Sequence, residues 1–268
     1  MMGGSIALAA LRAGYRVSLY DRMASEKLAG PKFCHASVVN DLAELVLNSQ
    51  LIILATPIGA LAQVGSDLSE LVGPDHVVSD VASVKRTVAE MLATVFRNRC
   101  GYVPAHPMAG SEKSGAEAAR DDLFGGAVTL LCPELSAEAG SVSLVSGFWE
   151  KLGTRVVLVS AAAHDQLVAV MSHLPHLIAA LLVKHVAATN KAALDLCGPG
   201  FRDVTRIASG APGLWADILL SNADALQEQL RAFKRELDEA MILLREKDAK
   251  KLQALLDDAK ENRDRLSP

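Results

Sequence analysis

The stretch GGSIALAALRAGYRVSLYD occupies residues 3–21. It predicts an apolar helix over residues 3–13, closed by Gly14, and a strand over residues 16–21. Open α/β sheets hold the pyrophosphate and ribose of a dinucleotide with a glycine-rich turn that opens a helix and an acidic residue about 20 positions later. The stretch therefore predicts a dinucleotide site. Its expected cofactor contacts are Gly3, Gly4, Ser5, Asp21 and Arg22.

The charge at the end of the strand bears on the choice of cofactor. Asp21 would accept hydrogen bonds from the adenosine ribose hydroxyls and would repel a 2′-phosphate, which favours NAD. Arg22 beside it could accommodate that phosphate, so NADP stays an alternative.

No strand and no earlier G-x-G precede Gly3 in the sequence, although this fold normally has its first strand there, in the middle of the sheet. We therefore expect the gene product to begin upstream of Met1 and to include both features. The alternative is a genuine truncation, which would weaken or abolish NAD binding.

Strand and helix patterns keep alternating to about residue 160. Apolar strands are expected at 51–56, 76–81, 101–105, 128–132 and 155–159. Helices are expected at 41–47, where Asn40 would be the cap, at 84–96, and in segments that end near residues 72 and 153. This alternation is typical of a doubly wound α/β sheet.

The strand signal ends after residue 160. Helical patterns cover 161–190, a segment around 202–209, 214–233 and 236–266. We predict a dinucleotide-binding domain at 1–160 and an all-helical domain at 161–268. The helical part has more apolar face than so short a chain can bury, so we expect a homodimer through residues after about 160.

Composition bounds the partners and the compartment. The formal net charge of −4 gives no basic surface for nucleic acid. The four cysteines lie far apart without a C-x-x-C pair, as expected of reduced thiols in a cytoplasmic protein. Residues 166–183 carry no charged side chain, but His173 and His176 lie within this run, so we expect a helix buried in protein and no membrane span.

The run AHPMAGSEKSG, residues 105–115, places His106 on a turn-rich loop after the predicted strand 101–105. Ligands bind at the carboxyl ends of strands in open α/β sheets, and histidine exchanges a proton near neutral pH. His106 is therefore a candidate catalytic residue. The alternative is a surface loop with an incidental histidine.

Residues that follow two of the strands and a pair of histidines are further candidate site residues. Thr56, Pro57 and Ser83 follow strands and would line the cofactor cleft, although Thr56 or Ser83 could equally cap a helix. His173 and His176 are three apart, which permits a metal pair but, without a third ligand, favours a substrate-lining or core role and no metal.

Arg202 and Arg206 are four apart on one helical face. A guanidinium binds both oxygens of a carboxylate, which makes this pair a candidate for an anionic substrate. A surface salt bridge with Asp203 or Asp217 is the alternative.

Five blocks of sequence, taken together, resemble the prephenate and arogenate dehydrogenase family. The blocks are MGGS (2–5), DVASVK (80–85), HPMAGSE (106–112), SHLPH (172–176) and FRDVTRI (201–207), the last followed by WADI (215–218). They cover nearly the whole chain in order. The resemblance implies a Rossmann-type domain, a helical dimerisation domain and NAD(P)-dependent oxidative decarboxylation of a dicarboxylate on the route to tyrosine.

The resemblance also implies roles for individual residues. His106 looks like the base that hydrogen-bonds the ring hydroxyl, and Ser83 like its partner near the nicotinamide. Arg206 looks like the clamp on a substrate carboxylate, and Glu112 like the gate at the pocket mouth. The other expected substrate contacts are Ser111, His173 and His176.

The chain departs from the family pattern at its missing first strand and leading glycines, and at Ala82, where the family often has glycine. Two other functions are therefore kept as alternatives. One is another NAD(P)-dependent hydroxyacid dehydrogenase, and the other is a non-catalytic dimeric module without a nucleotide site. The sequence does not decide between prephenate and arogenate.

Overall fold

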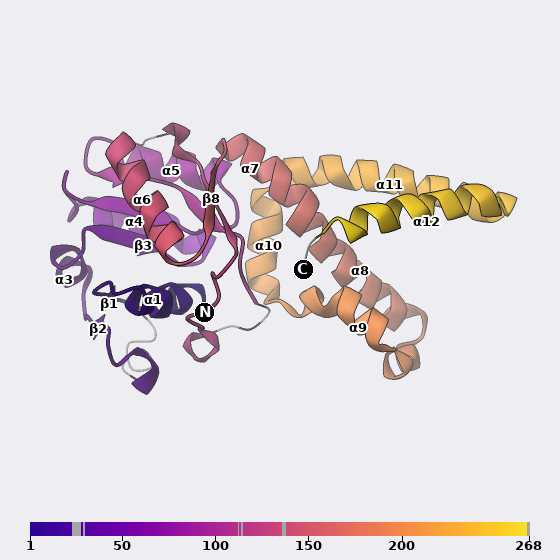
Figure 1. Ribbon diagram of the computed structural model, residues 1–268, viewed down its shortest axis with the longest axis horizontal. Coiled ribbons are helices and arrows are strands. Elements are labelled where there is room, and N and C mark those ends of the chain that lie inside the picture. Colours follow the sequence, from indigo (N-terminus) through magenta and orange to yellow (C-terminus); the bar gives the residue numbers. More distant parts are fainter. Residues whose placement is uncertain (23–27, 29, 112, 114, 136–137, 267–268) are drawn as a thin grey trace. The chain divides into compact units, whose positions relative to one another are not determined.

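The computed structural model describes residues 1–22, 28, 30–111, 113, 115–135 and 138–266 (Figure 1). The first element is helix α1 (Met2–Arg12), which Gly14 ends with a φ of +84°. The amide of Gly14 donates to Leu11 O and that of Tyr15 to Ala10 O, the paired bonds of a glycine C-terminal motif. The predicted helix and its stop are thus confirmed.

The strands of the described residues form three small sheets. Strands β1 (Ser18–Leu19) and β2 (Ser37–Val38) pair in parallel, with the short helix η1 (Pro31–Phe33) before β2. A second parallel sheet contains β3 (Leu51–Leu54), β4 (Val77–Asp80) and β5 (Gly101–Tyr102) in that order. The α/β alternation predicted from the sequence is confirmed.

Helices cover the second sheet. They are α3 (Leu42–Leu47), α4 (Ile58–Ser69) and α5 (Arg86–Phe96). One hydrophobic core joins α4 and α5 to β3 and β4, and includes the fully buried Leu61, Val78 and Leu92. The cap of α3 is Asp41, whose side chain accepts from the amide of Glu44, so the expected cap at Asn40 is wrong by one residue.

The third sheet corrects the expected strand 101–105. Residues Gly101–Tyr102 form β5, whereas β6 (Ala105–Pro107) turns away and pairs antiparallel with β7 (Val128–Leu131), which runs parallel to β8 (Arg155–Leu158). Pro104 explains the break, because proline has no amide to continue the ladder with β4. His106 therefore lies on a strand and not on a loop, opposite Leu130.

Helix α6 (Ala139–Lys151) and the short helices η2 (Ala116–Ala118) and η3 (Pro133–Leu135) complete this part of the chain. The side chain of Trp149 on α6 is fully buried in a second core with Ile6 of α1 and Leu131 of β7. This core fixes the strand that carries His106.

The helical part begins with α7 (Ala161–Val168), a π-helical turn η4 (Ala169–His173) and α8 (Leu174–Thr189). Together they form one helix, Ala161–Thr189, that is long and apolar enough to cross a membrane by length and composition alone. The π-turn lies just before Pro175, where the missing amide interrupts the normal bonding pattern. It places His173 and His176 on the same stretch of helix.

The remaining helices are η5 (Lys191–Leu196), α9 (Pro199–Thr205), η6 (Arg206–Ser209), α10 (Pro212–Ser221), α11 (Ala223–Glu246) and α12 (Ala249–Asp264). The expected helices 214–233 and 236–266 are wrong in their boundaries. Asn222 interrupts the first because its side chain is engaged inside the protein, and Lys247, with a φ of +54°, separates α11 from α12. Asp248 then caps α12.

Contacts divide the chain into two compact units, Met1–Ala223 and Asp224–Pro268. Residues 161–223 belong to the first unit because Trp215 and Ile218 of α10 pack into the core of the second sheet, and α7 contacts α5. The domain boundary at residue 160 stays a prediction.

Candidate active site

His106 begins a chain of three buried side chains. Its Nδ1 lies 2.8 Å from Nε2 of His164 on α7, and Nδ1 of His164 lies 2.8 Å from Oδ1 of Asp165. The side chain of His106 retains 9% exposure and that of His164 retains none. Within the described part of the chain, Nε2 of His106 has no hydrogen-bond partner. One edge of the His106 ring is thus held, and the other is left for a ligand.

The Asp165 carboxylate is held at the start of α5. Its Oδ1 accepts from the amide of Lys85 at 2.7 Å and its Oδ2 from the amide of Arg86 at 3.0 Å. Burial opposes ionisation of Asp165, but the hydrogen bonds from His164 and from these two amides outweigh it and lower the pKa of the carboxyl. Asp165 is therefore an anion that can only accept hydrogen bonds.

Both imidazoles are neutral at neutral pH. Burial lowers the pKa of His106 well below its ordinary value, and His164, the Lys85 ammonium and His173 add to the effect. Burial also lowers the pKa of His164, although Asp165 opposes that shift. A neutral imidazole has one nitrogen free to accept a proton, which a general base requires.

A buried ion pair lies beside this chain of side chains. Lys85 is fully buried and its Nζ donates to Oδ1 of Asp80, while the Tyr102 hydroxyl donates to Oδ2 of Asp80 at 2.8 Å. The amide of Ala82 also donates to Oδ1, at 2.9 Å. These bonds fix the connection from β4 to α5, which carries Ser83. No role for Asp80 or Lys85 was predicted from the sequence, although two opposite charges in an apolar stretch were a usable signal.

The predicted pair His173 and His176 occupies two different environments. His173 is 1% exposed, its Nδ1 lies 3.2 Å from Nδ2 of Asn222, and burial lowers its pKa to about 4. His176 stacks on Trp215 with ring centroids 3.4 Å apart. Its Nδ1 is buried with no partner among the described residues, which favours a polar contact to a ligand.

The expected cofactor residues gather at the start of α1 and at the ends of β3 and β4. No side chain of the described residues caps α1, so its first amides can bind an anion. A Cβ on Gly3 would lie 3.1 Å from Ala55, and a Cβ on Gly4 would lie 2.9 Å from Ala119. These glycines therefore let α1 begin close to the end of β3. The residues present fit the phosphate-binding end of a dinucleotide site.

The other predicted cofactor residues have distinct placements. Asp21 and Arg22 are exposed and follow β1. Burial lowers the pKa of the Met1 α-amino group, and the negative charge of Asp21 opposes that shift. Asp21 thus lies near the start of α1. Ser5 makes hydrogen bonds within the protein instead. Its fully buried hydroxyl accepts from the amide of Arg120, and its own amide donates to Met1 O.

The strand-end residues share one edge of the second sheet. Leu54 of β3 and Asp80 of β4 are paired in register, so Thr56 and Pro57 follow one strand where Ser83 follows its neighbour. Thr56 and Pro57 are exposed and Ser83 is partly buried. This is the edge at which open α/β sheets bind ligands.

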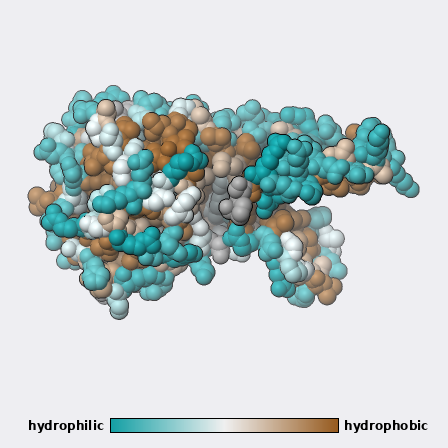
Figure 2. Space-filling model, in the orientation of Figure 1, coloured by the Kyte–Doolittle hydropathy of each residue, from teal (hydrophilic) through white to brown (hydrophobic). Residues whose placement is uncertain are grey.

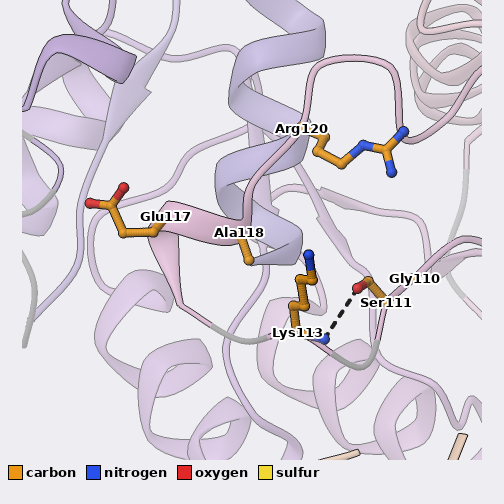
Figure 3. A pocket seen from close by; sticks show the side chains of 6 residues that line it. All are labelled: Gly110, Ser111, Lys113, Glu117, Ala118 and Arg120. Carbon is orange, nitrogen blue, oxygen red and sulfur yellow. Dashed lines mark hydrogen bonds between the residues drawn. The ribbon is translucent and has the colours of Figure 1, made fainter. Parts of the chain in front are cut away.

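Ser111 lines a cavity of about 400 Å³ next to the start of α1. The cavity is lined by Gly110, Ser111, Lys113, Glu117, Ala118 and Arg120 (Figure 3). The ammonium of Lys113 and the guanidinium of Arg120 give it positive charge, and Figure 3 shows Glu117 pointing away from Lys113. The predicted gate residue, Glu112, lies outside the described residues.

Arg206 borders a second cavity. Arg206 is exposed, and the cavity of about 420 Å³ is also lined by Arg202, Phe201 and Cys197. The structure brings His106 and His173 together around Lys85 and His164. Helix η6, which begins at Arg206, packs on α8, the helix that carries His176.

Two family models match most of this chain. Residues 6–158 match the family described as prephenate dehydrogenase, nucleotide-binding domain, and residues 160–258 match prephenate dehydrogenase, dimerization domain. A prephenate dehydrogenase of Bacillus subtilis is 32% identical over 277 residues, which cover 99% of this chain and 74% of the relative.

Two solved structures are similar to this chain over nearly its whole length. Prephenate dehydrogenase from Aquifex aeolicus in complex with hydroxyphenyl propionate and NAD⁺ superposes with a TM-score of 0.89 at 29% identity, covering 99% of this chain and 95% of that one. Arogenate dehydrogenase from Synechocystis superposes with a TM-score of 0.83 at 28% identity, covering 99% of this chain and 96% of that one.

Proposed function

This chain belongs to the prephenate dehydrogenase family, and from that premise we propose how its own residues perform the reaction. It is an NAD(P)-dependent oxidoreductase that catalyses oxidative decarboxylation in tyrosine biosynthesis, with NAD as cofactor. The substrate is prephenate, giving 4-hydroxyphenylpyruvate, or arogenate, giving tyrosine. The neutral, buried His106, with one ring edge held by His164 and the other open, is the observation that carries the proposal.

His106 is the catalytic base. Its Nε2 takes the proton of the ring hydroxyl while the C–H bond at the same carbon releases a hydride and the ring loses carbon dioxide. NAD, when bound, accepts that hydride. The aromatic ring that forms supplies the driving force, so the protein needs mainly to orient the substrate and to accept the proton.

The remaining predicted residues bind and orient. Ser83, at the end of β4, contacts the substrate near the nicotinamide, and Arg206 holds a substrate carboxylate. Glu112 is the gate at the pocket mouth. Ser111, His173 and His176 line the substrate, and the unpartnered Nδ1 of His176 supports its role. For the cofactor, the uncapped start of α1 holds the pyrophosphate and Asp21 the ribose, while Gly3, Gly4, Thr56 and Pro57 shape the cleft.

We propose a homodimer in the cytoplasm. Residues 160–258 match a dimerization domain, and Figure 2 shows hydrophobic surface over α8 and α9 on the face in view. Exposed apolar side chains in these helices include Leu181 and Val204. All four cysteines are free, as in a reducing compartment. Light scattering of the full chain tests the dimer: a mass near twice 28.3 kDa is expected, and a monomer at micromolar concentration would contradict it.

A side-by-side turnover assay tests the function. The purified chain is given prephenate or arogenate, each with NAD or NADP, and reduced nicotinamide is followed by absorbance. We expect turnover with NAD and at least one of the two substrates, and the ratio of kcat/KM values assigns the substrate. Binding of NAD without turnover of either substrate would favour another hydroxyacid dehydrogenase, and absence of NAD binding would favour the non-catalytic module.

A further inference from the structure

We propose that His164 and Asp165 form a positioning pair that sets the tautomer of His106, keeping the proton on Nδ1 and leaving Nε2 free to accept. The pair holds the base from its far side and acts on the reaction only through His106. This inference rests on the proposed function for its kinetic consequence, but the tautomer itself is a property of the protein alone.

Asp165 fixes the direction of the first hydrogen bond. Two backbone amides, those of Lys85 and Arg86, donate to its two oxygens, and an amide can only donate. The carboxylate is therefore an acceptor on every side. Nδ1 of His164, 2.8 Å from Oδ1, must then carry a hydrogen and donate it.

The direction of the next hydrogen bond follows. His164 is fully buried and neutral, so a hydrogen on its Nδ1 leaves its Nε2 without one. Nδ1 of His106, 2.8 Å away, must be the donor in that contact. The single hydrogen of neutral His106 is thus on Nδ1, and the lone pair of its Nε2 is available.

The same bonds support the charged form of the base. When Nε2 takes the proton of the substrate hydroxyl, the O–H bond breaks, an N–H bond forms and His106 becomes an imidazolium. Its Nδ1–H already points at an acceptor, which is polarised in turn by the Asp165 anion. No proton needs to leave His164 during the reaction.

Other charged groups near His106 favour the same state. The Lys85 ammonium lies nearby, paired with Asp80, and His173 lies on η4. Together with His164 they disfavour a positive charge on His106. An alternative with a protonated His164 that donates to His106 would need a buried imidazolium beside Lys85.

Asp165→Leu is the most informative substitution. Oδ1 of Asp165 accepts from both the amide of Lys85 and Nδ1 of His164, so an asparagine oxygen in its place would preserve the pattern, whereas leucine offers no acceptor. Nothing then holds the hydrogen of His164 on Nδ1, and with a hydrogen on Nε2 of His164 the hydrogen of His106 moves to its own Nε2. The variant is expected to lose at least about tenfold in kcat, with KM and the Kd for NAD within about twofold. Asp67→Leu, at an exposed carboxylate on α4, is the matched control and should retain full kcat.

The tautomer is read without substrate or cofactor. Two-bond ¹H–¹⁵N correlation spectra of protein labelled with ¹⁵N at its seven histidines distinguish a hydrogen on Nδ1 from one on Nε2, and loss of a signal in His106→Asn assigns that residue. We expect Nδ1–H at His106 in the unmodified chain and a mixture of the Nδ1–H and Nε2–H forms in Asp165→Leu. Nε2–H in the unmodified chain, or an unchanged tautomer and kcat in the variant, would overturn the proposal.

A second pair of variants covers the case in which Asp165→Leu does not fold. His164→Gln offers an amide oxygen that can still accept from Nδ1 of His106, whereas His164→Leu offers no acceptor. We expect Gln to retain at least tenfold more kcat than Leu at similar KM. Equal losses in both would show that His164 only fills space. If the unmodified chain lacks turnover but shows Nδ1–H at His106, the proposed function fails while this inference stands.

Discussion

The buried histidine chain (His106, His164, Asp165) and the exposed arginine face (Arg202, Arg206) differ in how completely the protein itself has organised them. Each polar contact within the histidine chain is made inside the protein, at 2.8 Å per step. The arginines are exposed on a helix and border an open cavity. A group that moves a proton needs a fixed tautomer and a fixed position, whereas a group that captures an anion must meet it at the surface. The two regions should therefore respond differently to substitution.

The largest effect is expected for His106→Asn. Removal of the base should lower kcat by about 10²- to 10⁴-fold or more, while an NAD titration gives a nearly unchanged Kd, because the imidazole acts on the substrate. His185→Asn, an exposed histidine on α8, serves as the control. Retention of more than about a tenth of kcat would remove His106 from the role of base.

Lys85→Met tests how much the ion pair beside the histidine chain contributes to stability. Asp80 would lose its ammonium partner while fully buried, which should cost about 3–5 kcal/mol in the free energy of unfolding. Denaturant unfolding measures this cost. Lys250→Met, an exposed lysine on α12, should change stability by less than about 0.5 kcal/mol. Equal stability in the two variants would mean that the buried pair contributes nothing specific.

Arg206→Ala tests the arginine face by a different readout. Loss of a charged partner for a substrate carboxylate should raise KM by about 10- to 100-fold and lower kcat far less. Because the side chain is exposed, its removal should leave the melting temperature within a few degrees. An unchanged KM would return Arg206 to an ordinary surface role.

The stability of the buried region should depend on pH. His173 has a folded pKa of about 4, against 6.5 in the unfolded chain, so the unfolded state binds more protons below pH 6.5 and stability falls as pH falls. From pH 7 to pH 5 the loss from this group is roughly 2 kcal/mol. Thermal unfolding at several pH values measures it, and His173→Asn should flatten the dependence. A melting temperature that rises toward pH 5 would contradict these pKa directions.

The sequence predicted some features of the fold and of the histidine chain and not others. The alternation of elements to residue 160, the stop at Gly14 and the importance of His106 could be inferred, because each depends on local pattern or on a recognisable motif. The position of His106 on a strand could not be inferred. The chain turns at Pro104 from the sheet of β4 to that of β7, and this pairing depends on contacts between residues that are distant in sequence. The break at Asn222 was hidden for the same reason: its amide bonds to Asp165 O and His173, which are distant in sequence.

The partners of His106 were also missed. His164 and Asp165 lie 58 and 59 positions after it, near the start of the helix predicted at 161–190. A His-Asp dipeptide at the start of a helix was the available signal, but nothing local indicates that it faces β6. Asp80 and Lys85 carried a stronger signal, since a charge in a buried segment needs a partner of opposite sign and Lys85 follows Asp80 by five positions.

The dependence of kcat/KM on pH, measured at saturating NAD from pH 5 to pH 9, tests most directly whether a neutral, buried His106 is the base. Burial, His164, Lys85 and His173 lower its pKa below 6.5, so the proton-accepting form is already complete at pH 7. We predict a constant kcat/KM from pH 7 to pH 9 and a decline on the acid side with an apparent pKa below 6.5, absent in His106→Asn. An acid limb with an apparent pKa above 6.5, or a kcat/KM that rises as the pH falls, would contradict the account.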